Sequence, residues 1–106
     1  MKTTDKFKKA FSYWWYLNML PNYMGDMEVK DFALLHPSLQ WGLFQDFADS
    51  LGYDLGVTNT YNGYEPFIKS KTIESHLNIQ DSRIEARLLA ITTFIYIHDN
   101  HDNDEN

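Results

Sequence analysis

Residues 36–53 read HPSLQWGLFQDFADSLGY, and both ends of a helix can be located within them. Pro37 suits the first helical turn, where its missing N–H would have no partner, and Gly52 suits the left-handed residue after the last turn. Between them, apolar side chains recur at helical spacing, which predicts an amphipathic helix over residues 36–51 with one buried stripe. This stripe consists of Leu39, Leu43, Phe44, Phe47 and Leu51.

A first helix is predicted before this stretch, over residues 4–20. Phe7, Phe11 and Trp14 fall on one of its faces, and Pro21 ends it. Aromatic residues on its other faces cannot all be buried, because a helix that borders a small core buries only one stripe.

A third helix is predicted near the other end of the chain. Ser82 and Glu85 have the spacing of a capping box, so we expect the helix to run from Ser82 to Ile97. We expect it to pack face to face with the helix over residues 36–51. Its expected buried stripe consists of Ile84, Leu88, Ile91, Phe94 and Ile95.

Between these helices, residues 53–70 have the period of a β-hairpin. Asn62-Gly63 is a two-residue turn signal between β-branched and aromatic residues. Pro66 cannot donate to a sheet ladder, so we expect its strand at an edge or bulged. Residues 70–80 form a polar connection that leaves room for one more short strand.

These elements predict an α+β fold. It is a single domain over residues 1–98, in which three helices pack on a short antiparallel β-hairpin in the order helix-helix-hairpin-helix. An acidic disordered tail is expected over residues 99–106.

The composition describes a small acidic protein. The chain has 106 residues, a formal net charge of −6 and no cysteine, which excludes disulfides, thiolate catalysis and cysteine-ligated metal. The acidic balance argues against direct binding of a nucleic-acid backbone, which requires clustered basic residues. The N-terminal segment carries polar positions, so we predict neither a signal peptide nor a membrane span and expect a cytoplasmic protein.

Two segments carry a recognisable pattern. They comprise His36-Pro37-Ser38, Trp41-Gly42, Phe44 to Phe47, Asp49-Ser50-Leu51-Gly52 and Arg83-Ile84-Glu85-Ala86-Arg87. Over about residues 36–97, the chain thereby resembles a group of small uncharacterised proteins encoded by bacteriophages and prophages. The resemblance implies a phage origin and action inside a bacterial host cell, and it implies no catalytic residue and no cofactor.

Potential metal ligands gather at the C-terminus. His98 and His101 are three residues apart, which puts two imidazoles on one side of a helix. A terminal run of Asp, Asn and His is typically a solvated tail, so the two histidines are weak metal candidates and no metal site is expected. The serines and glycines form neither a nucleophile elbow nor a phosphate loop, so we expect no enzyme.

Acidic residues concentrate in the middle of the chain, where Lys30 is the only basic residue between positions 26 and 54. They are Asp26, Glu28, Asp31, Asp46, Asp49 and Asp54. An exposed face of this kind can imitate nucleic-acid phosphates and occupy a basic groove of a host protein. Ordinary surface charge that maintains solubility explains the same residues.

Aromatic residues make up 16% of the chain, more than one core of this size needs. Tyr13, Trp15 and Tyr16 are the rings that we expect at the surface, where such rings anchor interfaces. The favoured hypothesis is therefore a non-enzymatic protein-binding module whose partner is a host or phage protein or a second copy. The alternatives are an acidic nucleic-acid mimic that inhibits a host defence or replication protein, and a small metal-dependent enzyme.

Overall fold

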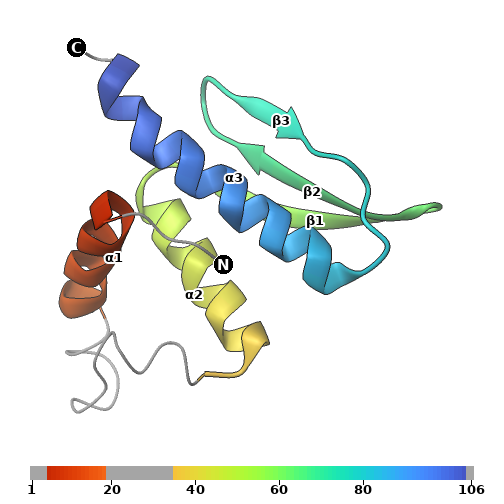
Figure 1. Cartoon of the computed structure of the whole chain (residues 1–106), viewed down its shortest axis with the longest axis horizontal. Coiled ribbons are helices and arrows are strands. Elements are labelled where there is room, and N and C mark those ends of the chain that lie inside the picture. Colours follow the sequence, from red (N-terminus) through yellow and green to blue (C-terminus); the bar gives the residue numbers. More distant parts are fainter. Residues whose placement is uncertain (1–4, 19–34, 105–106) are drawn as a thin grey trace.

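Three helices and a three-stranded antiparallel sheet make up the described part of the chain (Figure 1). The computed structural model describes the backbone of residues 5–18 and 35–104 and the side chains of residues 5–14 and 35–100. The elements are α1 (Asp5–Asn18), α2 (Pro37–Ser50), β1 (Asp54–Thr60), β2 (Gly63–Lys69), β3 (Glu74–His76) and α3 (Arg83–Asp104). The predicted α+β class is confirmed, with β3 as an additional short strand.

Local hydrogen bonds define the helix ends that the sequence predicts. Pro37 opens α2, and His36 caps it through its Nδ1, which accepts a hydrogen bond from the backbone N–H of Ser38 at 3.1 Å. Gly52 follows α2 with a left-handed φ of 88°, which a residue without Cβ adopts without strain. The Ser82 hydroxyl oxygen caps α3 by accepting from the backbone N–H of Glu85 at 3.1 Å.

The β1–β2 hairpin turns one residue earlier than predicted. Thr60 pairs with Gly63, so the two turn residues are Tyr61 and Asn62. Gly63 has a φ of 148°, and a Cβ placed there would lie 2.5 Å from the carbonyl oxygen of Gln80. Glycine is therefore required because the chain that enters α3 passes directly over this position.

The prediction that Pro66 marks an edge strand is wrong, because β2 is the central strand of the sheet. The alternative of a bulge agrees with the pairing on the β3 side, where the register shifts by one residue between Phe67–His76 and Tyr64–Gln80. Tyr64 exchanges backbone hydrogen bonds with Gln80, so the even-numbered residues of β2 direct their backbone groups away from β1. The missing N–H of Pro66 therefore faces the β3 side, where β3 has already ended with the Phe67–His76 pair. The ladder therefore lacks one bond here: the N–H of Leu77 donates to the Pro66 carbonyl at 2.9 Å, and Pro66 has no N–H to return that bond.

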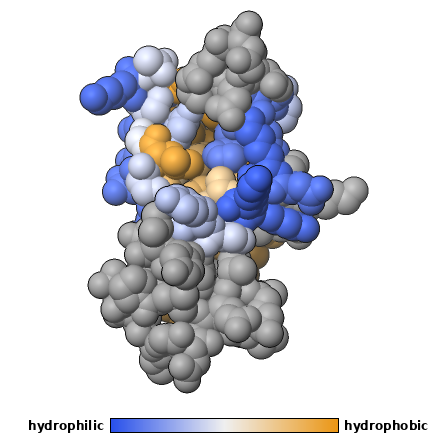
Figure 2. Space-filling model, turned by 90° about the vertical axis from the view of Figure 1, so that its left-hand side faces the viewer, coloured by the Kyte–Doolittle hydropathy of each residue, from blue (hydrophilic) through white to orange (hydrophobic). Residues whose placement is uncertain are grey.

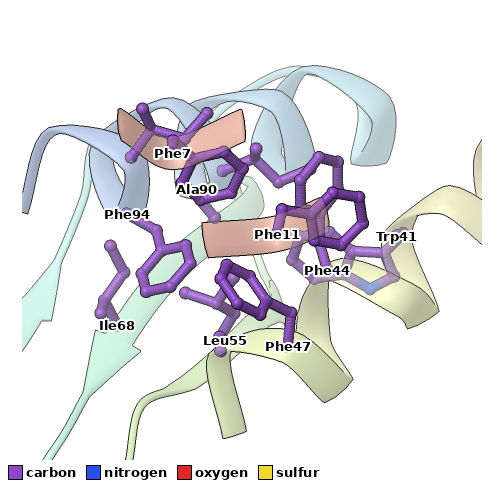
Figure 3. Packing of buried hydrophobic residues seen from close by; sticks show 12 residues of the cluster. Phe7, Phe11, Trp41, Phe44, Phe47, Leu55, Ile68, Ala90 and Phe94 are labelled. Carbon is purple, nitrogen blue, oxygen red and sulfur yellow. The ribbon is translucent and has the colours of Figure 1, made fainter. Parts of the chain in front are cut away.

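Aromatic side chains from all three helices meet in one core (Figure 3). The ring centroid of Phe7 on α1 lies 5.4 Å from that of Phe47 on α2 and 5.9 Å from that of Phe94 on α3. Leu55 of β1 and Ile68 of β2 close the core from the sheet side, and both are buried. In Figure 1, α3 crosses one face of the sheet, and α1 lies against the half of α3 nearer the C-terminus.

The helix stripes predicted from the sequence are only partly buried. Phe44, Phe47, Ile91, Phe94 and Ile95 are buried as expected. Leu39, Leu51, Ile84 and Leu88 are exposed instead, and Trp41, Ala48, Ala86 and Ala90 are buried in addition. The expectation that Leu88 belongs to the core is therefore wrong.

The described contacts between α1 and α3 lie away from the exposed end of the α3 stripe. Phe7 contacts Phe94 and His98, and the Lys6 ammonium donates to the backbone carbonyl of Asp99 at 3.1 Å. These contacts lie in the later turns of α3, away from the turns that carry Ile84 and Leu88. A helix is buried only where a neighbour covers it.

Helix α3 extends further than predicted. It runs to Asp104 instead of Ile97, so residues 99–104 of the proposed tail are helical. No helix in residues 5–18 or 35–104 is long and apolar enough to cross a membrane.

Candidate binding surface

Two grooves meet on the side of the molecule where α2 and the first turns of α3 lie next to β1. The larger one has a volume of about 550 Å³, and we call it the arginine groove. It is lined by Trp41 and Gln45 of α2, Asp54, Leu55, Gly56, Val57 and Asn59 of β1, Phe67 of β2, and Arg83 and Arg87 of α3.

Both arginines of this chain line the arginine groove, one helical turn apart. The guanidinium carbon of Arg83 lies 5.4 Å from the ring centroid of Tyr64, and that of Arg87 lies 5.6 Å from the ring of Trp41. These cation–π contacts hold the planar heads in position. Within the described residues neither arginine forms an ion pair, and the Nε of Arg87 is buried without a hydrogen-bond partner.

One wall of the arginine groove is the free edge of β1. Residues 54, 56 and 58 pair with β2 through their backbone groups, so the N–H and C=O groups of Val57 and Asn59 point away from β2. Gln45 covers the beginning of this edge, because its side-chain amide donates to the carbonyl of Leu55 at 2.9 Å. The edge beyond Leu55 makes no hydrogen bond with the described part of the chain.

The second groove is small and apolar. It has a volume of about 60 Å³ and lies between α2 and α3, and we call it the apolar groove. Ile84 and Leu88 line it and are 61% and 44% exposed. Trp41 and Arg87 line both grooves, so apolar and cationic surface are continuous here.

The aromatic residues predicted to bind a partner lie on α1. Tyr13 is 68% exposed, whereas Trp14 is half-buried and stacks on Phe11 with 5.7 Å between the ring centroids. The side chains of Trp15 and Tyr16 lie outside the described residues, so their role stays a prediction. Viewed from the side on which α1 lies, hydrophilic residues surround a small hydrophobic area (Figure 2).

The predicted acidic face is described only in part. Asp46 and Asp49 on α2 and Asp54 at the start of β1 are exposed. Asp26, Glu28 and Asp31 lie outside the described residues. A single continuous face of all six carboxylates therefore stays a prediction.

His98 lies beside the aromatic core. Its side chain is 14% exposed, its ring centroid lies 5.4 Å from that of Phe7, and its Nδ1 lies 3.2 Å from a carboxylate oxygen of Asp99. The side chain of His101 is outside the described residues. Among the residues that the structure places, no three metal-ligating side chains come together.

A histidine that the sequence analysis did not single out lies on the open face of the sheet. The Nδ1 of His76 is 2.9 Å from a carboxylate oxygen of Glu65, and its Nε2 is 3.3 Å from one of Glu74. Hydrogen bonds to Glu74 and Glu65 raise the pKa of His76 above its ordinary value of 6.5. The strand register brings these residues together. His76 pairs with Phe67, and Glu65 lies two residues before Phe67 on β2, so its side chain is on the same face of the sheet.

The sequence analysis also did not identify Arg83 and Arg87 as site residues. Their spacing of four was visible and indicates a shared helix face. Their ring partners Tyr64 and Trp41 are distant in sequence, so the cluster exists only in the folded chain. No known protein family, curated protein or solved structure matches this chain.

Proposed function

We propose that this protein is a non-enzymatic protein-binding module. The observation that carries the proposal is the junction of the apolar groove with the arginine groove at Trp41 and Arg87. Arginine is among the residues most enriched at the positions that dominate interface energy. Trp41 is itself buried and supports the Arg87 side chain through its ring. Exposed Ile84 and Leu88 add apolar area beside them, and a partner that covers these side chains removes that area from water.

The biological setting belongs to the same proposal. We propose that the module is a phage accessory protein that acts in the cytoplasm of a bacterial host and binds a host or phage protein. Support for this setting comes from the resemblance over about residues 36–97.

A second candidate function is an acidic mimic of nucleic acid. The exposed carboxylates of Asp46, Asp49 and Asp54 favour it. A mimic would bind a basic partner through these carboxylates and would not use the apolar groove. Its binding would weaken strongly as salt concentration rises, whereas apolar docking would persist.

A capture experiment with four versions of the full chain separates these functions. Wild type, Leu88→Ser, Tyr13→Ser and the double variant Asp46→Asn/Asp49→Asn are immobilised and incubated with bacterial lysate. All three sites are exposed, so circular dichroism should show unchanged folds.

We expect a captured protein that is lost only with Leu88→Ser. Loss only with the double carboxamide variant would support the mimic, and loss only with Tyr13→Ser would move the binding surface to α1. Equal capture by all four chains would contradict the proposal.

A further inference from the structure

We propose that the arginine groove accepts an extended acidic segment of a partner protein. This segment adds as a fourth strand to the free edge of β1 and places a carboxylate on Arg83 and Arg87. The inference rests on the proposed protein-binding function and specifies the chemistry of the partner.

The main-chain part of the inference follows from the strand register. Val57 and Asn59 present their N–H and C=O groups outward, with no partner in the described residues. An extended peptide is the ligand that satisfies both donors and acceptors of such an edge at once. Because Gln45 already covers the carbonyl of Leu55, the added strand begins after Leu55 and runs along the later half of β1.

The charge of the segment follows from the two arginines. In a chain with a net charge of −6, both guanidinium groups line this groove, and neither forms an ion pair in the described part. The cation–π contacts with Tyr64 and Trp41 restrict both arginine side chains, which lowers the entropic cost of binding a carboxylate. The Nε of Arg87 is buried and has no acceptor among the described residues, so a partner carboxylate pairs with the terminal nitrogens of this guanidinium group.

The position of the acidic residue follows from Asp54. Among the described residues that line the groove, this is the only one with a carboxylate, and it lies at the start of β1. The guanidinium group of Arg83 lies over the ring of Tyr64. Tyr64 pairs with Asn59 near the other end of β1. Asn59 lies five residues after Asp54, which corresponds to about 16 Å along the strand. The acidic side chain of the partner therefore belongs at the Asn59 end, away from repulsion by Asp54.

A peptide explains the groove better than a nucleic-acid phosphate. A phosphate would pair with the arginines but would leave the outward N–H and C=O groups of β1 without partners. The net charge of −6 also repels a polyanion, whereas a short acidic segment carries only a few charges.

The test uses two peptide libraries and the full chain. In the first library, peptides of about eight residues carry Glu at every second position and Val, Ile, Thr or Tyr elsewhere, and in the second Lys replaces Glu. Enriched peptides are measured by calorimetry, and amide hydrogen exchange is followed by NMR at Val57, Thr58 and Asn59. Thr58 is an internal control, because its amide already faces β2.

Two variants separate the parts of the inference. Asn59→Pro removes an outward N–H without removing a β1–β2 hydrogen bond, and Asn59→Thr is its matched control. Arg87→Gln removes the charge and retains much of the side-chain length. We expect Glu peptides to be enriched over Lys peptides and to slow exchange at Val57 and Asn59 by about tenfold or more. Arg87→Gln should weaken binding about tenfold to a hundredfold, and Asn59→Pro about tenfold, while Asn59→Thr binds like wild type.

Three outcomes would overturn the inference. They are enrichment of neither library, binding without slower exchange at Val57 and Asn59, and tighter binding of a single-stranded oligonucleotide that displaces the peptide. If any of these occurs while Leu88→Ser still abolishes capture of a partner, only the acidic strand is refuted and the protein-binding function stands. If Leu88→Ser also leaves capture unchanged, the proposed function fails as well.

Discussion

Leu88 and Ile91 occupy the same stripe of α3, and truncating each to alanine tests whether the apolar groove is open. Ile91 is 4% exposed. Removing three carbons from a fully buried side chain costs about 0.8 kcal/mol per carbon, or about 2.4 kcal/mol before any cavity is counted. With the cavity, Ile91→Ala should lower the free energy of unfolding by about 2–5 kcal/mol.

Leu88 is 44% exposed, so its truncation to alanine loses only roughly half of the transfer energy that a fully buried side chain would lose. Because water reaches the site, no enclosed cavity forms, and Leu88→Ala should cost only about 1.3 kcal/mol. Urea denaturation of both variants measures the difference in their free energies of unfolding. The comparison requires that this free energy depends on urea concentration with the same slope in both variants. If Leu88→Ala costs as much as Ile91→Ala, the side chain is part of the core in solution, and the open groove on which the proposed function depends does not exist.

Two further predictions concern α1 and the sheet. Phe7→Ala should lower the free energy of unfolding by about 3–5 kcal/mol, because this ring contacts both α2 and α3. Urea denaturation measures this change. A loss as small as that of a surface substitution would show that α1 does not pack on the other helices. The raised pKa of His76 means that its contribution to stability is complete below pH 6.5 and is lost as pH rises through the higher folded-state value. The Tm difference between wild type and His76→Gln should therefore be larger at about pH 5.5 than at about pH 8.5, and equal differences would contradict the contact with Glu65 and Glu74.

The helix ends could be predicted from the sequence because their causes are local. Pro37, Gly52 and Ser82 act through hydrogen bonds or backbone angles within a few residues of themselves. The extent of burial could not be predicted in the same way. Leu88 fits the helical stripe as well as Ile91 does, and which of the two is covered depends on the tertiary arrangement of the helices.

The place of β2 in the sheet and the residues of the candidate surface could not be predicted, because both depend on how distant segments pair and pack. Pro66 argued for an edge strand, and no feature of its own sequence neighbourhood shows that a third strand pairs with β2 up to His76 and keeps only the bond from the Leu77 N–H to the Pro66 carbonyl. In the same way, Arg87 becomes a candidate ligand because Trp41 lies beneath it and because the edge of β1 borders the same groove. These contacts join residues far apart in the chain, so periodicity cannot show them.

The contact of α1 with the later turns of α3 has a consequence for the order in which this chain folds. At a synthesis rate of about 5–20 residues per second, α1 leaves the ribosome at least about 4 s before Phe94 does. Until then Phe7 lacks the α3 ring that it contacts in the core. The contacts of α1 with the later turns of α3 therefore delay completion of the core until α3 has been translated.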